Sequence, residues 1–206
     1  MKSRFIGVFF TAIGSLLVLP LSADQGPEGH NILSPDDPIV ALKETTQGAP
    51  NILAGTGDFG GIDGDMELAA NAIDNDPGTK YFNKGQNNAG SPGIDTGFVV
   101  TPNLGATTIT GIQFATANDM PDRDPVAVTI EGSTSPDAAK AQTKDFTLIY
   151  QGPTGLEKTT DRNAWGIPIS FTNTASYKSY RVLITKTRGD NTDATQYGEV
   201  RLLGGS

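Results

Sequence analysis

Residues 71–82 read NAIDNDPGTKYF, a run that joins a candidate cation-binding loop to the aromatic start of a core strand. Asp74 and Asp76 are two positions apart, and the Pro-Gly pair that follows them favours a turn. In such a turn both carboxylates and several freed carbonyls can converge on one point before Thr79 closes the loop. Ca²⁺ prefers an oxygen cage of this kind, although the spacing does not match an EF-hand. The alternative is an Asx-rich surface turn whose carboxylates bond their own backbone.

Apolar and polar residues alternate along most of the chain, which is the period of half-buried strands. The strands predicted in this way cover residues 39–42, 98–100, 107–117, 126–130, 146–150, 167–171, 180–184 and 200–202. Helical signal is confined to residues 67–72 and to a weak surface segment at residues 135–142. Many short strands joined by Gly, Pro, Asn and Asp turns predict an all-β antiparallel sandwich, or jelly roll, of about eight strands.

The N-terminus has the layout of a secretory signal peptide over residues 1–23. Two basic residues precede an apolar run at residues 5–19, which is too short to cross a bilayer comfortably, and no later segment is more apolar. We therefore expect export to the periplasm or the exterior, with no membrane span. Residues 24–37 are rich in Pro, Gly and acids and are predicted to be a flexible lead-in. Residues 38–206 then form one domain.

The composition excludes several classes of function. A formal net charge of −8 disfavours nucleic acid and anionic membranes as partners. The chain has no cysteine, and its one histidine, His30, lies in the predicted lead-in, which argues against zinc sites and against Ser-His or Cys-His catalysis. A pair of carboxylates able to cleave a glycosidic bond is the catalytic arrangement that the sequence leaves open. We expect a protein that is not an enzyme.

A family resemblance becomes specific at residues 72–81. This stretch, AIDNDPGTKY, resembles the Ala-hydrophobe-Asp-Gly-x-x-x-Thr-x-aromatic signature of discoidin, or coagulation factor type C, domains. Residues 199–204 (EVRLLG) look like the closing strand of those domains, and residues 114–125 and 130–133 are similar to a bacterial secreted branch. The resemblance spans residues 38–204. It implies a galactose-binding-like jelly roll, related to family 32 carbohydrate-binding modules and usually used for recognition.

The same resemblance implies a structural calcium site. Asp74, Asp76 and Thr79 match the loop of the family's site, and Glu199 matches its acid from the last strand. Asn75 stands where the family usually has glycine, but asparagine tolerates positive φ, so the turn is retained. An ion here would tie the loop to the end of the chain, which is a structural task and not a catalytic one.

Five residues are candidates for contacting a ligand. Trp165, the only tryptophan, lies in a polar loop, where its ring either stacks on a sugar or caps the end of the sandwich. Arg123 lies among aspartates that include Asp119, so this loop either donates hydrogen bonds to a ligand or clamps itself. Tyr81 follows the cation loop and faces either a ligand or the core. Arg188 belongs to a loop near the C-terminus that could complete a polar rim.

Two functions fit these features. The first is a secreted, non-catalytic module that binds a polysaccharide or a cell-surface glycan. The second is an adhesion or structural domain of the envelope or matrix, which contacts a cell-surface protein. An exposed Trp165 with polar neighbours favours the sugar, whereas a flat apolar face favours the protein partner.

Overall fold

The computed structural model describes residues 29–44, 52–53, 67–84, 93–137, 145–190 and 192–205. Nearly all regular structure in these ranges is antiparallel β-strand, as the sequence predicts. The predicted signal peptide lies outside the described residues, and so does most of the predicted surface helix at residues 135–142. No helix in the described ranges is long and apolar enough to span a membrane.

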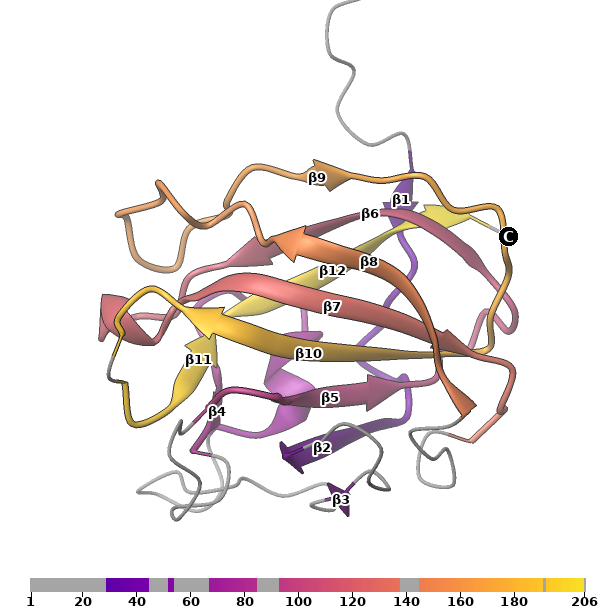
Figure 1. The fold of residues 1–206 in the computed structure, drawn as a ribbon, viewed down its shortest axis with the longest axis horizontal. Helices are drawn as coiled ribbons and strands as arrows, with labels where there is room; N and C mark the ends of the chain where they lie inside the picture. Colours follow the sequence, from indigo (N-terminus) through magenta and orange to yellow (C-terminus); the bar gives the residue numbers. More distant parts are fainter. Residues whose placement is uncertain are drawn as a thin grey trace, which may run out of the picture.

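The strands form a sandwich of two sheets with a short ribbon at one end (Figure 1). The larger sheet has the order β3 (Ile52–Leu53), β2 (Ile39–Glu44), β5 (Thr96–Val100), β10 (Ser179–Thr187), β7 (Pro125–Ser133) and β8 (Thr147–Pro153). The smaller sheet has the order β1 (His30–Asn31), β12 (Glu199–Gly205), β6 (Thr108–Ala115) and β9 (Ile169–Ser170). The ribbon pairs β4 (Tyr81–Asn83) with β11 (Thr195–Tyr197).

The core lies between the two sheets and is made by alternate residues of their strands. On β12, Val200 and Leu202 are buried in the same hydrophobic cluster as Phe114 of β6 and Val182 of β10. Arg201, between the two apolar residues of β12, therefore points to the outer face of the smaller sheet. Burial of these apolar side chains supplies the main stabilisation of the fold.

The described start of the chain is anchored, which corrects the prediction of a flexible lead-in for residues 29–37, whereas residues 24–28 lie outside the described ranges. Ile32 and Leu33 are buried in the core at 2% and 6% exposure. Asn31 pairs with Leu203 at the edge of the smaller sheet. The prediction missed this anchor because two adjacent apolar residues are too short a run to show a strand period.

Two short 3₁₀ turns position the loops at the ribbon end of the sandwich. The first, η1 (Ala69–Ala72), falls within the predicted helical segment and buries Ala69 and Ala72. The chain then enters the Asp74 loop and continues into β4. The second turn, η2 (Pro121–Arg123), lies in the connection from β6 to β7. Both turns fix polar loop residues against the packed strands.

Candidate functional site

The Asp74 loop, residues 74–79, is held by Asx-type hydrogen bonds. Oδ1 of Asp74 accepts from the backbone N–H of Asp76 at 2.8 Å, and Oδ1 of Asp76 accepts from that of Gly78 at 2.8 Å. The Thr79 hydroxyl donates to Oδ2 of Asp74 at 2.8 Å. Asn75 has a φ of 67°, the left-handed conformation that its place in the turn requires. The loop therefore forms the Asx-rich turn that the sequence offered as one alternative.

Glu199 reaches this loop from β12 and lies beside Asp74, whose carboxylate accepts from the Thr79 hydroxyl. The carboxylate of Asp76 is turned to the backbone N–H of Gly78. Oε1 of Glu199 accepts a hydrogen bond from the backbone N–H of Asp76 at 3.1 Å. Burial, followed by a hydrogen bond to Asp74 and the negative charge of Asp74, raises the pKa of Glu199 to about 8. Two carboxyl groups that share a proton form a site where a divalent cation can take the place of that proton.

The surrounding atoms are hard oxygen donors of the kind that calcium requires. Within the described ranges, no three His, Cys, Asp or Glu side chains come together as a metal cluster, so other ligands would be neutral oxygens. A Cβ added at Gly198 would lie 2.9 Å from the carbonyl oxygens of both Pro77 and Thr116. The Asp74 and Glu199 carboxyl groups and the Thr79 hydroxyl are oxygen donors of the kind that fit the implied ion.

A hollow of about 530 Å³, here called the loop-end pocket, lies beside the Asp74 loop. Its lining comes from the segment before η1, the Asp74 loop, β4 and its flanking residues, the connection after β6 with η2, and the segment before β11. It consists of Glu67, Gly78, Thr79, Lys80, Phe82, Lys84, Asn118, Asp119, Arg123 and Asp193. Three carboxylates thus face three cations, which leaves the pocket without net formal charge.

Five of the six charged groups of the loop-end pocket form ion pairs with one another, and the sixth, Lys84, lies over the Phe82 ring at 5.6 Å. Nζ of Lys80 lies 3.1 Å from Oε1 of Glu67 and 3.0 Å from Oδ1 of Asp119. Arg123 forms a two-pronged contact with Asp193, donating from Nε at 2.8 Å and from Nη2 at 2.9 Å. These hydrogen bonds hold the pKa of Asp193 below its usual value. The pocket therefore presents a fixed pattern of donors and acceptors.

Arg188 belongs to a clamp and not to a ligand site, which corrects its prediction as a ligand residue. It shares the fully buried Asp124 with Arg162: Arg188 donates to one carboxylate oxygen at 3.1 Å and Arg162 to both, at 2.9 and 2.5 Å. Arg188 also donates to the carbonyls of Leu156 at 2.7 Å and Glu157 at 2.9 Å. Burial raises the pKa of Asp124 to about 6, and the positive charge of Arg162 opposes that rise.

Tyr81 is also wrong as a ligand residue, because it lies wholly inside the protein at 0% exposure. Its hydroxyl donates to the carbonyl of Gly97 at 2.8 Å, and its ring meets that of Tyr197 edge-on at 5.5 Å. Phe82 is nearly as buried and lies under the guanidinium of Arg123, 5.1 Å from ring centre to Cζ. The core-packing alternative is therefore correct for Tyr81.

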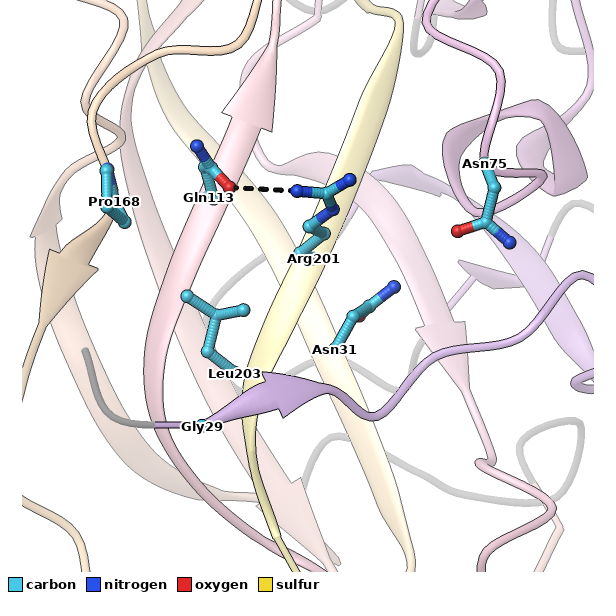
Figure 2. Close-up of a pocket in the computed structure, with 7 residues that line it drawn as sticks. All are labelled: Gly29, Asn31, Asn75, Gln113, Pro168, Arg201 and Leu203. Carbon is cyan, nitrogen blue, oxygen red and sulfur yellow. Dashed lines mark hydrogen bonds between the residues drawn. The ribbon is translucent and has the colours of Figure 1, made fainter. Parts of the chain in front are cut away.

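Trp165 does not line the loop-end pocket but belongs with the smaller sheet, where it bridges to Ala115. The guanidinium of Arg201 lies 3.8 Å from the centre of its half-buried ring. Beside Arg201 is a second hollow of about 470 Å³, here called the sheet-face pocket (Figure 2). Its lining consists of Gly29, Asn31, Asn75, Gln113, Pro168, Arg201 and Leu203.

The sequence pattern did not predict the sheet-face pocket. Arg201 and Gln113 occupy the outward positions of β12 and β6, and such positions look like ordinary solvated strand residues. What links Arg201 and Gln113 is that they are paired on the outward face of two neighbouring strands. This pairing can be recognised only when the strand register is known.

No protein-family model and no curated protein matches the chain by sequence. Solved structures match it by fold. The CBM32-3 module of a family 31 glycoside hydrolase from Clostridium perfringens has 19% identity and a TM-score of 0.51, covering 68% of this chain and 84% of the module. Chitosan-binding module 1, from a chitosanase/glucanase of Paenibacillus sp. IK-5, has 17% identity and a TM-score of 0.51, covering 86% and 100%.

A further module of Clostridium perfringens, CBM32-5, was solved in complex with GalNAc-β-1,3-galactose. It has 12% identity and a TM-score of 0.52, covering 82% of this chain and 95% of that one. The chain thus has the discoidin-like sandwich fold of family 32 carbohydrate-binding modules, which confirms the fold that the sequence resemblance implied.

Proposed function

We propose that the protein is an exported, non-catalytic carbohydrate-binding module that holds a neutral sugar in the loop-end pocket. The observation that carries this proposal is that Lys80 is paired with Glu67 and Asp119, and Arg123 with Asp193. Sugar hydroxyl groups both donate and accept hydrogen bonds, and a pocket of paired charges offers both without an uncompensated charge.

Asp119 and Arg123 have capacity left for such a ligand. Lys80 and Gln196 both donate to Oδ1 of Asp119, so its Oδ2 has no partner among the described residues, and its side chain is 51% exposed. Arg123 uses Nε and Nη2 on Asp193, and its Nη1 has no partner in the described ranges. One acceptor and one donor at the same pocket can together bind two neighbouring hydroxyl groups.

The fold supports a carbohydrate ligand. Among the solved modules that share this fold, one contains GalNAc-β-1,3-galactose and another is a chitosan-binding module. The loop-end pocket is open and polar and has no accessible aromatic platform, since Phe82 is buried. We therefore expect a weak dissociation constant, on the order of micromolar to millimolar.

We also propose that the Asp74 loop holds a structural calcium ion. Asp74, Asp76, Thr79 and Glu199 would hold it, and a bound ion would supply positive charge that replaces the shared proton. The hydrogen bonds of these residues already tie β12 to the loop. Binding of the ion adds to the stability of the folded state and takes no part in a reaction.

Export and the lack of catalysis are parts of the same proposal. The predicted signal peptide supports export, and mass spectrometry of secreted protein is expected to find Asp24 as its first residue. The one histidine is exposed on β1 and the chain has no cysteine, which supports a binding role. We expect no release of reducing ends from a panel of polysaccharides. Turnover that disappears with one Asp or Glu substitution would overturn this part.

A glycan array probed with residues 24–206, followed by titration calorimetry on the strongest neutral glycan, tests the binding site. Asp119→Ala and Arg123→Gln are each expected to weaken binding about tenfold, which is about 1.4 kcal/mol. Lys186→Gln is the control, because Lys186 is exposed on β10 of the larger sheet. Neutral-glycan affinity that survives both pocket substitutions would contradict the proposed site. Binding to a cell-surface protein, with no glycan bound, would favour the adhesion function instead.

A further inference from the structure

We propose that the sheet-face pocket is a second binding site, which takes a carboxylate-bearing sugar such as a uronic acid residue of a polysaccharide. Arg201 is the residue that binds the acid. This site lies on the outer face of the smaller sheet and has no lining residue in common with the loop-end pocket (Figure 2). It therefore goes beyond the neutral-sugar function proposed above.

Arg201 differs from every other arginine in the described part of the chain in lacking a carboxylate partner. The others pair as Arg123 with Asp193, Arg162 and Arg188 with Asp124, and Arg181 with Glu131. Arg201 makes one hydrogen bond in these ranges, donated from Nη1 to Oε1 of Gln113 over a long 3.4 Å. In a chain with a net charge of −8, acids are plentiful, yet no carboxylate of the described residues forms an ion pair with this guanidinium.

Packing fixes the orientation of Arg201 without using its donors. Val200 and Leu202 anchor β12 in the core, and the Arg201 guanidinium lies on the Trp165 ring at 3.8 Å. This cation–π contact holds the guanidinium without using its N–H groups, which lie along the edge of its plane. A guanidinium edge matches the two oxygens of a carboxylate in a two-pronged contact.

The neighbours of Arg201 suit the rest of a sugar ring. Gln113 lies directly opposite on β6, where its Nε2 donates to the carbonyl of Gly166 at 3.0 Å and fixes its amide. Asn31 lies across β12 on β1 (Figure 2). The Asn31 amide donates to the carbonyl of Leu33 and accepts from its backbone N–H, both at 3.2 Å, so each of these amides keeps one N–H and one lone pair for hydroxyl groups. Leu203 offers an apolar surface to the C–H face of a ring. The volume of about 470 Å³ is in the range of small-molecule sites.

The test measures binding of oligogalacturonate and of the same oligomer with its carboxylates methyl-esterified, by titration calorimetry. The acid form is expected to bind at least about tenfold more tightly, because esterification removes the charge that Arg201 recognises. Arg201→Gln is expected to lower the affinity for the acid form to that for the ester. Equal binding of the two oligomers by the unmodified protein would overturn the proposal.

Arg201→Gln also removes the contact with Trp165, so a second variant that leaves Arg201 in place is needed. Gln113→Glu preserves side-chain size and gives Arg201 a carboxylate of its own, but it loses the hydrogen bond from Nε2 to the Gly166 carbonyl. It is expected to remove acid binding in a variant that still melts cooperatively above the temperature of the titration. Lys186→Gln is the charge-matched control and is expected to bind normally. Uronate affinity that persists in folded Gln113→Glu would overturn the role of Arg201.

Two further titrations distinguish a carboxylate site from a general polyanion site and from the loop-end pocket. Binding of dextran sulfate without binding of oligogalacturonate would overturn the assignment to a carboxylate. The neutral glycan of the loop-end pocket, titrated on Arg201→Gln, is expected to keep its affinity, which supports two separate sites. Loss of both ligands together in folded Arg201→Gln would overturn that separation. If the unmodified protein binds oligogalacturonate but no neutral glycan, the function proposed for the loop-end pocket is contradicted and the uronate site is supported.

Discussion

The loop-end pocket and the sheet-face pocket are similar in volume, about 530 and 470 Å³, but differ in how their arginines are partnered. Arg123 in the first is held on both prongs by Asp193, whereas Arg201 in the second lies on an aromatic ring. The first pocket is neutral and the second carries an uncompensated positive charge. The partner of an arginine, more than its presence, therefore decides which ligand a surface suits.

Asp124 is the most strongly partnered acid near the loop end, because two arginines share it, and its substitution has the largest expected effect on stability. Asp124→Asn leaves Arg162 and Arg188 around a buried site with no negative charge, so the free energy of unfolding is expected to fall by about 4 kcal/mol. Denaturant titration measures the change. The control, Asp122→Asn, alters an exposed neighbour and is expected to change stability by less than about 0.5 kcal/mol. Equal effects of the two substitutions would mean that the clamp contributes little.

The pH dependence of stability tests the loop that borders both pockets. Glu199 has a pKa of about 8 in the folded state against an ordinary 4.5, so the folded state keeps a proton that the unfolded state releases. In chelator, the free energy of unfolding is therefore expected to fall as pH rises from about 4.5 to 8, by on the order of 3 kcal/mol. Glu199→Gln cannot titrate and should show a flatter profile. Parallel profiles for the two proteins would refute the shared proton.

Calcium is expected to act on the same loop with a smaller effect. At tenfold its dissociation constant the ion stabilises the folded state by about 1.4 kcal/mol, which raises the melting temperature by about 3–5 °C. Asp74→Ala should abolish the rise, and Glu199→Ala should reduce it. Thermal melts in chelator and in added calcium measure it. Identical melts of the unmodified protein would leave the loop as an Asx-rich turn only.

Trp165→Leu carries the smallest expected effect and sharpens the contrast between the pockets. Removing the ring beneath Arg201 costs a cation–π contact of about 0.5–1 kcal/mol, so uronate affinity is expected to fall about two- to fivefold. Affinity for the neutral glycan should not change, because Trp165 does not line the loop-end pocket. A loss of neutral-glycan binding would instead restore Trp165 to the neutral-sugar site that the sequence suggested.

The fold was largely predictable because its strands alternate strongly. Val200 and Leu202, for example, reveal both β12 and its core face. The short ribbon strands β4 and β11, with three residues each, give no comparable period and were missed. Ile32 was missed for the same reason. Short strands depend on a partner strand for their definition, and that partner is distant in sequence.

The candidate sites were predictable where residues act through nearby backbone or a family motif. Asp74 and Thr79 meet within one loop, and Glu199 was placed there by resemblance. Arg188 could not be judged, since its main partners are backbone carbonyls about 30 positions away and the buried Asp124. Arg201 was overlooked because its distinguishing feature is that it has no carboxylate partner among the described residues, which only the folded chain reveals.

The Asp74 loop lines both the sheet-face pocket and the loop-end pocket. Asn75 faces the sheet-face pocket, while Gly78 and Thr79 face the loop-end pocket, so one short turn contributes to both. If an ion that orders this turn alters the affinity of either pocket by some factor, thermodynamic reciprocity requires the sugar to alter the affinity for the ion by the same factor. The turn would then couple the calcium ion to a sugar that does not contact it. The affinity of the protein for a polysaccharide with neutral and acidic residues would in that case depend on the calcium concentration.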